Sequence, residues 1–251
     1  MENDNGELVN KIEVLYEDED MCVINKPAGV MVHNDGRSTE KTVVDWLLSR
    51  LPAVRGIGEG GFAQDGSPLE RSGVVHRLDR ETSGVLVLAK TQEAFLHLKK
   101  QFHDHYIKKE YRTIVYGTMK EKWGTVNRPI GRSTKDFRLR SAQRGARGAL
   151  REALTDWELI GQSETHAYLK ITPKTGRTHQ IRVHLKAIGR PIVHDELYAP
   201  PELLAGENLG FTRLALHAYR LQVAVLRGEE MTFIAPFPLD FEEASTAIAS
   251  A

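Results

Sequence analysis

Cysteine is almost absent from this chain, and further shortages narrow the class of protein it can be. The 251 residues include one cysteine, Cys22, so no disulfide can form within the chain and a reducing compartment is the natural setting. No apolar run approaches the roughly 18 residues of a membrane span. The N-terminal stretch MENDNGELVN is too acidic and polar for a signal peptide. We therefore expect a cytoplasmic protein with no membrane segment.

Net charge is also lacking, because 34 Lys and Arg balance 34 Asp and Glu, but the two signs are separated along the chain. Residues 97–151 hold fifteen basic and four acidic residues, and residues 170–190 add six basic residues and no acid. The acids gather at the ends, with eight in residues 1–20 and eight in residues 196–251. Solvated surface charge would explain one short basic run. A run this long and one-sided also fits a face that binds a polyanion.

Hydrophobic periodicity predicts an α+β fold built around a mainly antiparallel sheet. Helices are expected at 41–51 with Thr42 as the N-cap, at 91–105, and at 175–189, where Thr178 caps the helix and Gly189 ends it. Strands are expected at 11–16, 21–26, 74–75, 85–89, 108–117, 152–160, 165–173, 213–226 and 230–238. The glycine-spaced basic stretch GARGALR, residues 145–151, is interpreted as a flexible loop that contacts phosphate.

The most unusual stretch is HRLDRETSG, which lies between the apolar runs VV and VLVLA and surrounds Asp79 with charge. A carboxylate near buried strands loses hydration, and a permanently charged arginine can hold it ionised by bonding both oxygens. Arg77 and Arg80 are available locally, and Arg177 and Arg182 come from the predicted helix at 175–189. An ionised, partly desolvated aspartate can act as a nucleophile or a base. The alternative is an aspartate that only bonds the backbone of a turn.

A wider pattern resembles the pseudouridine synthases of the RluA type. HRLDRETSG is preceded by NKPAG and followed by KKEYRTIVYG and KTGRTHQIRVHL, and the resemblance extends from about Ile12 to Pro236. It implies a pseudouridine synthase fold, with a mixed but mainly antiparallel central sheet flanked by helices and loops and a catalytic cleft across the sheet. The implied domain is 12–238, between an acidic N-terminal tail at 1–11 and a C-terminal tail at 239–251.

The resemblance also implies site residues. Asp79 matches the catalytic aspartate, Tyr111 the active-site tyrosine, and Arg182 the arginine that pairs with the aspartate. Arg77 matches an arginine that contacts RNA or fills the position left by the flipped base, and His76 is expected either to support the RNA or to bond its own loop. The expected substrate-binding set is Arg77, His76, Arg177, His179 and Leu216, the last lining the uracil pocket.

The implied reaction isomerises uridine in RNA. The N1–C1′ bond breaks, the base turns, and carbon 5 joins C1′, with Asp79 attacking C1′ or removing a proton from C2′. No metal or other cofactor is implied. The expected partner is a stem-loop of ribosomal RNA or transfer RNA, ribosomal RNA being favoured, and a monomer is expected. Only about eleven residues precede the first expected strand, so the small RNA-binding module that many relatives carry there is expected to be absent. The inserts near Gly56–Leu69 and Arg132–Arg147 are candidate RNA contacts instead.

Two other functions compete with this one. A non-catalytic RNA-binding or ribosome-assembly protein could keep the same fold, but Asp79, Tyr111 and Arg182 are all present. A glycosidase would need a second carboxylate close to Asp79, and the motifs offer arginines and a tyrosine instead.

Overall fold

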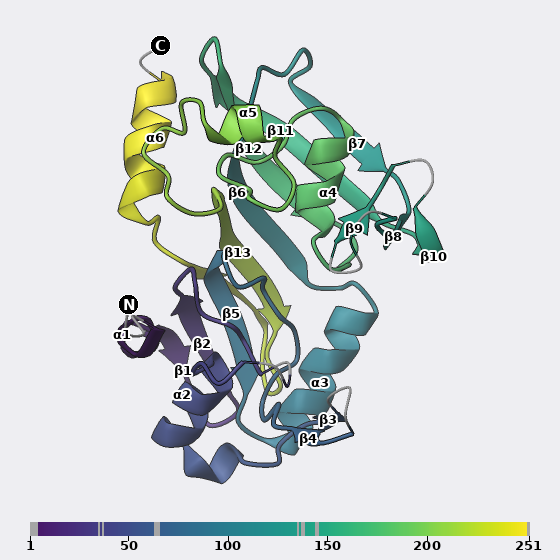
Figure 1. Ribbon diagram of the computed structural model, residues 1–251. Coiled ribbons are helices and arrows are strands. Elements are labelled where there is room, and N and C mark those ends of the chain that lie inside the picture. Colours follow the sequence, from purple (N-terminus) through teal and green to yellow (C-terminus); the bar gives the residue numbers. More distant parts are fainter. Residues whose placement is uncertain are drawn as a thin grey trace. The chain divides into compact units, whose positions relative to one another are not determined.

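The computed structural model describes residues 5–34, 36, 38–62, 66–134, 136, 139–143 and 146–249. The chain divides into two compact units (Figure 1). The first unit comprises Met1–Lys108 and Ala218–Pro236, and the second comprises Lys109–His217 and Phe237–Ala251. Each is a mixture of helices and mainly antiparallel strands, so the expected α+β class is confirmed.

The first unit is built on strands that pair in the order β1-β2-β5-β13, with β14 on the other edge of β13. The strands are β1 (Glu13–Glu17), β2 (Met21–Lys26), β5 (Ser83–Ala89), β13 (Leu216–Ala224), which begins in the second unit, and β14 (Glu230–Ile234), with a separate hairpin of β3 (Gly61–Phe62) and β4 (Pro68–Leu69). The helices are α1 (Asn5–Asn10), α2 (Val43–Arg50), the 3-10 turn η1 (Pro52–Val54) and α3 (Gln92–His103). All seven residues of β5 are buried, which gives this unit its central strand.

The second unit is built on strands that pair in the order β6-β12-β11-β7, and a small three-stranded sheet lies beside them. The strands are β6 (Lys108–Tyr116), β7 (Trp123–Asn127), β11 (Leu154–Gln162) and β12 (His166–Pro173), and the small sheet contains β8 (Ile130–Arg132), β9 (Arg140–Ser141) and β10 (Arg147–Arg151). The helices are α4 (Gln180–Ala187), α5 (Pro201–Leu204) and α6 (Leu239–Ala249).

Three local predictions are wrong. Val74 forms only an isolated bridge with Leu88, so the apolar pair at 74–75 is not a strand. The N-cap of α4 is His179, in the left-handed region at φ 56°, rather than Thr178. Residues 147–151 form strand β10 rather than a loop, because they pair with β8; Gly145 lies outside the described residues.

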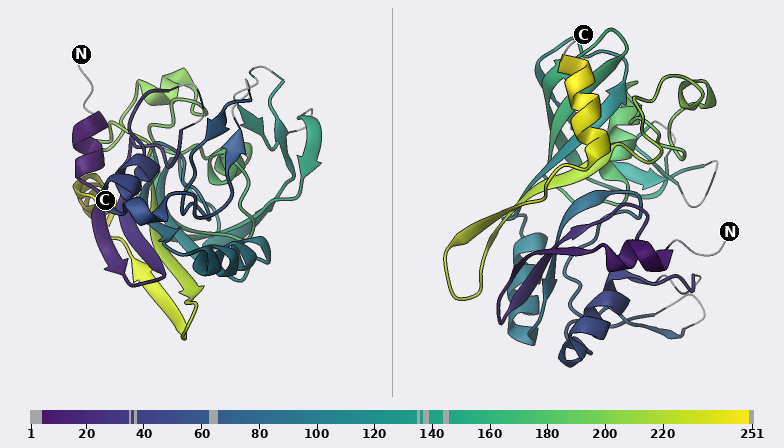
Figure 2. Two further views of the ribbon diagram at one scale, coloured as in Figure 1. Left: turned by 90° about the horizontal axis from the view of Figure 1, so that it is seen from below. Right: turned by 90° about the vertical axis from the view of Figure 1, so that its left-hand side faces the viewer.

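Both expected tails contain a helix. α1 lies at residues 5–10 and buries Val9. α6 packs against β11 and β12 and is the yellow helix in Figure 2. It buries Phe241, Ala244 and Ile248 in the core of the second unit, so residues 239–249 are part of that unit's packing. Among the described residues, no helix combines the length and the apolar character needed to cross a bilayer.

Candidate active site

Lys26 joins two sequence motifs that lie about fifty residues apart. This last residue of β2 is fully buried, and its ammonium donates to the carbonyls of Pro27 and Val30 at 2.8 Å and of Arg80 at 3.0 Å. A buried ammonium is costly unless it is hydrogen-bonded, and these carbonyls supply the bonds. Because Arg80 follows Asp79, the bond to its carbonyl ties NKPAG to the backbone beside the expected catalytic aspartate.

Arg80 strengthens the same connection, and the sequence left its role open. Its Nε donates to the carbonyl of Gly29 at 3.0 Å, and its Nη2 donates to Glu40 Oε1 at 3.1 Å. In return, the backbone N–H of Gly29 donates to the carbonyl of Arg80 at 2.9 Å. Arg80 therefore holds two loops of the first unit together.

Asp79 is half-buried at the end of this anchored segment. Its backbone carbonyl accepts a hydrogen bond from the N–H of Thr82 at 3.1 Å. The neighbouring Leu78, Thr82 and Ser83 are all buried. Buried residues on both sides fix the backbone of Asp79, as a catalytic carboxylate requires.

His76 contacts strand β5 and helix α3. Its Nε2 accepts a hydrogen bond from the backbone N–H of Val87 at 3.1 Å, and its ring stacks on Phe102 with 4.3 Å between ring centroids. These contacts fit the second of its two expected roles, which is to bond its own part of the chain. Arg77 is exposed, with Nη1 3.5 Å from His33 Nε2. Its expected contact with RNA stays a prediction.

In the second unit a polar network fixes helix α4. Gln180 Nε2 donates to Thr155 Oγ1 at 2.9 Å, and Thr155 Oγ1 lies 2.9 Å from His184 Nδ1. His184 Nε2 donates to the carbonyl of Arg128 at 2.9 Å. Burial lowers the pKa of His184, which keeps the ring neutral and lets Nδ1 accept the threonine proton. The polar residues of HQIRVH thus position the helix on which Arg182 lies.

Arg182 is buried and forms a two-point ion pair. Its Nε donates to Asp195 Oδ2 at 2.9 Å, and its Nη2 donates to Asp195 Oδ1 at 2.6 Å. The guanidinium carbon also lies 5.0 Å from the centre of the Tyr198 ring. A bidentate bond of this kind sets the plane of the guanidinium as well as its position. The expected pairing of Arg182 with Asp79 joins residues of different units and stays a prediction.

The remaining predicted residues lie in the second unit. Tyr111 is on β6 and packs against the main core, and Leu216 begins β13 and is 3% exposed. Arg177 Nε donates to the carbonyl of Glu152 at 3.1 Å. His179 Nδ1 lies 2.7 Å from the hydroxyl of Tyr198. Their roles toward a substrate stay predictions.

Sequence reasoning missed Asp195 and Tyr198. Asp195 Oδ1 also accepts the backbone N–H groups of Leu197 and Tyr198, both at 3.2 Å. The two residues stand three apart in VHDELY, outside any helix or strand. Because no periodic pattern covers this segment, its sequence carries no sign of a contact with Arg182.

The first unit thus anchors the Asp79 loop through a buried lysine, and the second unit fixes Arg182 by a bidentate ion pair. A model of the RNA pseudouridylate synthase family matches residues 20–187. This chain therefore belongs to the RNA pseudouridine synthases, and its reaction class is isomerisation.

Individual proteins of this family are similar to this chain over most of its length. An uncharacterised RNA pseudouridine synthase of Synechocystis is 41% identical over 233 residues, which cover 92% of this chain and 67% of that protein. Ribosomal large subunit pseudouridine synthase D of Zymomonas mobilis is 36% identical, over 92% of this chain and 71% of its own. The solved structure of human RNA pseudouridylate synthase domain containing 1 superposes with a TM-score of 0.70 at 26% identity, over 92% of this chain and 85% of its own. This chain thus spans about two thirds of the length of the curated relatives.

Proposed function

We propose that this enzyme converts specific uridines of large-subunit ribosomal RNA to pseudouridine, with Asp79 as the group that acts on the ribose. The observation that carries the proposal is the anchoring of the Asp79 loop by Lys26 and Arg80. Anchoring keeps the carboxylate in place while the glycosidic bond breaks.

Asp79 acts by one of two routes, both of which break the N1–C1′ bond. In the first, its carboxylate attacks C1′ and the uracil leaves with the bonding electrons. In the second, it removes the proton from C2′, and the uracil leaves with the N1–C1′ bonding electrons as the C1′–C2′ double bond of a glycal forms. In either route the base turns within the site and C5 bonds to C1′. The Asp79–C1′ bond breaks at this step in the first route, and Asp79 returns the proton to C2′ in the second. The C5 proton then goes to a base.

Tyr111 and Arg182 complete the proposed site. Tyr111 stacks against the flipped base and helps to remove the C5 proton. Arg182 holds the Asp79 carboxylate ionised, and Asp195 in turn fixes the plane of Arg182. To reach this site the target base must leave its stack, at a cost of a few kcal/mol.

The choice of ribosomal RNA rests on the relatives' names and on charge. Relatives with 36% identity are called ribosomal large subunit pseudouridine synthase D. The basic stretch from His97 to Arg151 suits a large structured polyanion. A cytoplasmic location and a monomeric state complete the proposal.

The test uses an unmodified transcript of bacterial large-subunit ribosomal RNA labelled with tritium at C5 of uridine. The wild-type protein is expected to release tritium, and Asp79→Asn to reduce the rate at least a thousandfold while RNA binding is retained. Asp104→Asn is the matched control, because Asp104 lies at the end of α3 and pairs with Lys100 and His103 at the surface.

The outcomes separate the candidate functions. Undiminished release by Asp79→Asn would overturn the role of Asp79. Tight RNA binding by the wild type without any release would favour the non-catalytic RNA-binding protein. Release from a transfer RNA transcript alone would overturn the ribosomal assignment and leave the reaction intact.

A further inference from the structure

Three arginines lie side by side across the small sheet of the second unit. Arg132 on β8 is the direct partner of Arg147 on β10 and also of Arg140 on β9. Residues directly opposite each other on antiparallel strands share a face, with Cβ atoms about 4.5–5.5 Å apart. The register therefore forms a row, Arg140–Arg132–Arg147, which we call the arginine row.

Like charges directly opposite each other destabilise a sheet unless something neutralises them. Within the part of the chain that the structure describes, none of the three guanidinium groups pairs with an acid. Arg132 and Arg147 are exposed, and every residue of β10 is exposed. The fold thus holds unneutralised positive charge at its surface.

The row is held rigidly. A Cβ on Gly131 would lie 2.9 Å from the carbonyl oxygen of Arg147, so glycine is what lets β10 approach β8 this closely. Beneath the sheet, Ile130 and Ala142 pack with Val183 of α4 and with Tyr198. The backbone N–H of Arg140 donates to the Tyr198 hydroxyl at 2.9 Å.

These contacts place the arginine row in a fixed relation to Arg182. Tyr198 bonds the backbone of β9 and also lies under the guanidinium of Arg182. A ligand held by the row is therefore held at a defined position relative to Arg182, within a single unit.

We propose that the arginine row binds consecutive phosphates of the RNA backbone outside the target nucleotide. The occupant follows from charge complementarity, since a row of arginines without acidic partners in the described part of the chain, two of the three being exposed, matches the repeated charges of a phosphate chain. The proposal rests on the proposed function, because it names how the same RNA substrate is held.

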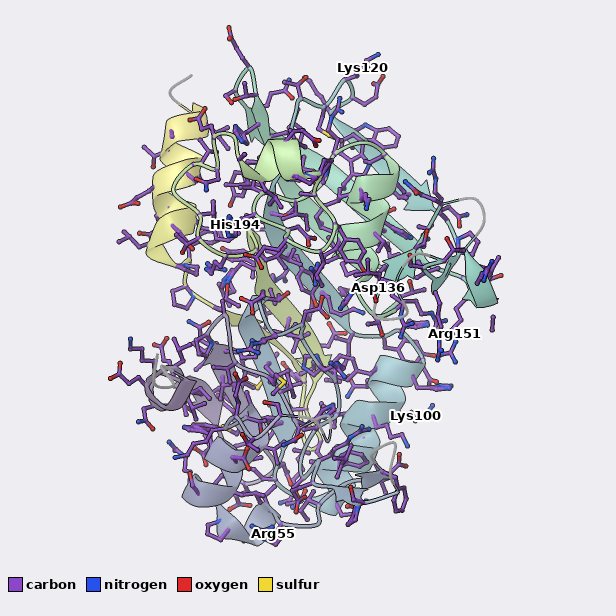
Figure 3. The ribbon with its side chains drawn as sticks, viewed as in Figure 1. Arg55, Lys100, Lys120, Asp136, Arg151 and His194 are labelled. Atoms are coloured by element: carbon purple, nitrogen blue, oxygen red, sulfur yellow. The ribbon has the colours of Figure 1, made fainter. Side chains whose placement is uncertain are left out.

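The test compares two pairs of substitutions in the second unit. Arg132→Gln with Arg147→Gln removes two charges from the row. Lys120→Gln with Lys122→Gln removes two exposed charges between β6 and β7. Figure 3 labels Lys120 at the other end of the unit from Arg151, the last residue of β10 in the small sheet. Binding of a fluorescein-labelled RNA hairpin is measured by anisotropy from 0.05 to 0.3 M KCl.

Each neutralised phosphate contact contributes a salt exponent of about 0.7–0.9, or roughly five- to eightfold in affinity at 0.1 M salt. The arginine pair is therefore expected to weaken hairpin binding about 25- to 60-fold and to reduce the salt slope by about 1.4–1.8. Arg132→Lys with Arg147→Lys keeps the charge. This variant is expected to retain most of the affinity for the hairpin and most of the salt slope. The lysine pair is expected to change affinity less than threefold.

A thermal melt supplies the second readout. Relief of repulsion is expected to leave the melting temperature of the Arg→Gln pair equal to or above that of the wild type. A lowered melting temperature would overturn the proposal, because the arginines would then serve the fold. An unchanged salt slope would also overturn it, in favour of an acidic protein surface as occupant. Tritium release by the wild type is measured separately, so its absence would count against the reaction and not against the row.

Discussion

At the scale of single residues, substitutions in the Arg182–Asp195 ion pair can test its contribution to stability separately from its proposed part in catalysis. Both side chains are buried, and removing one partner of such a pair leaves an uncompensated charge that costs about 3–5 kcal/mol. Asp195→Leu is therefore expected to lower the free energy of unfolding by about that amount. Chemical denaturation measures the loss.

A double substitution makes this prediction specific. Replacing a buried ion pair by apolar residues of similar volume is often neutral. Arg182→Met with Asp195→Leu is therefore expected to recover most of the stability and none of the tritium release. A stable double variant with wild-type activity would show that Arg182 takes no part in the reaction.

Burial of Lys109 is expected to make the free energy of unfolding of the protein depend on pH. Burial lowers the pKa of Lys109 to about 8, with Nζ 3.3 Å from the carbonyl of Thr175. An unfolded lysine has a pKa of about 10.4. Between these values the unfolded chain binds a proton that the folded chain does not, so the stability of the wild type rises with pH. Below pH 8 the folded state carries the full cost of the buried charge.

Lys109→Met removes that cost. It is expected to raise the free energy of unfolding by about 1–3 kcal/mol at pH 7, and the difference from the wild type is expected to vanish above about pH 10.5. Urea denaturation at several pH values measures it. The exposed neighbour Lys108 is the control, and Lys108→Met is expected to stay within about 0.5 kcal/mol of the wild type throughout. A pH-independent gain for Lys109→Met would contradict the assignment.

At the scale of elements, the close approach of β13 to β5 depends on Gly84. Its φ is +115°, and a Cβ there would lie 2.2 Å from the carbonyl oxygen of Ala218. Both the backbone conformation and the contact exclude a side chain. Glycine at this position therefore serves the packing of one strand against the other.

Gly84→Ala is expected to lower the free energy of unfolding by about 3 kcal/mol or more, because backbone strain adds to a backbone clash. Gly60→Ala is the control, since nothing lies within 4 Å of its Cβ position. Thermal melts of both variants test the difference. Equal melting temperatures would show that β5 and β13 can separate without loss.

Elements with a local signal were predictable, and those set by tertiary contacts were not. Thr42 is the N-cap of α2, as predicted, because its side chain and that of Asp45 form a capping box. His179 replaces Thr178 as the cap of α4, where the side chain of Gln180 accepts the backbone N–H of Arg177 instead. Strands β8 to β10 are two to five residues long, too short for alternation to reveal them.

The same limit applies to the site. Asp79 and the motifs around it could be identified because their order along the chain resembles a known family. Lys26 could be placed in NKPAG, but its three carbonyl partners depend on loop conformations that the residues do not encode locally. Asp195 had no signal, since its contact with Arg182 arises only when an irregular segment folds back onto α4.

At the scale of the whole molecule, neutrality conceals two oppositely charged units. The second unit has nineteen Lys and Arg against fourteen acids, a net charge of +5, and the first has fifteen against twenty, a net charge of −5. A polyanion should therefore be bound mainly through the second unit, although the sequence pI is about 7.2.

This separation predicts a strong effect of salt on KM and a weak effect on kcat. If the enzyme neutralises four phosphates, raising KCl from about 0.05 to 0.2 M should raise KM for the RNA transcript by roughly two orders of magnitude. The chemical step takes place at groups that are already in contact with the substrate, so kcat should change little. Tritium release across a range of RNA concentrations at each salt concentration separates the two constants. A KM independent of salt would mean that the charge of the second unit does not serve RNA binding, and recognition would then have to depend on contacts with bases and ribose.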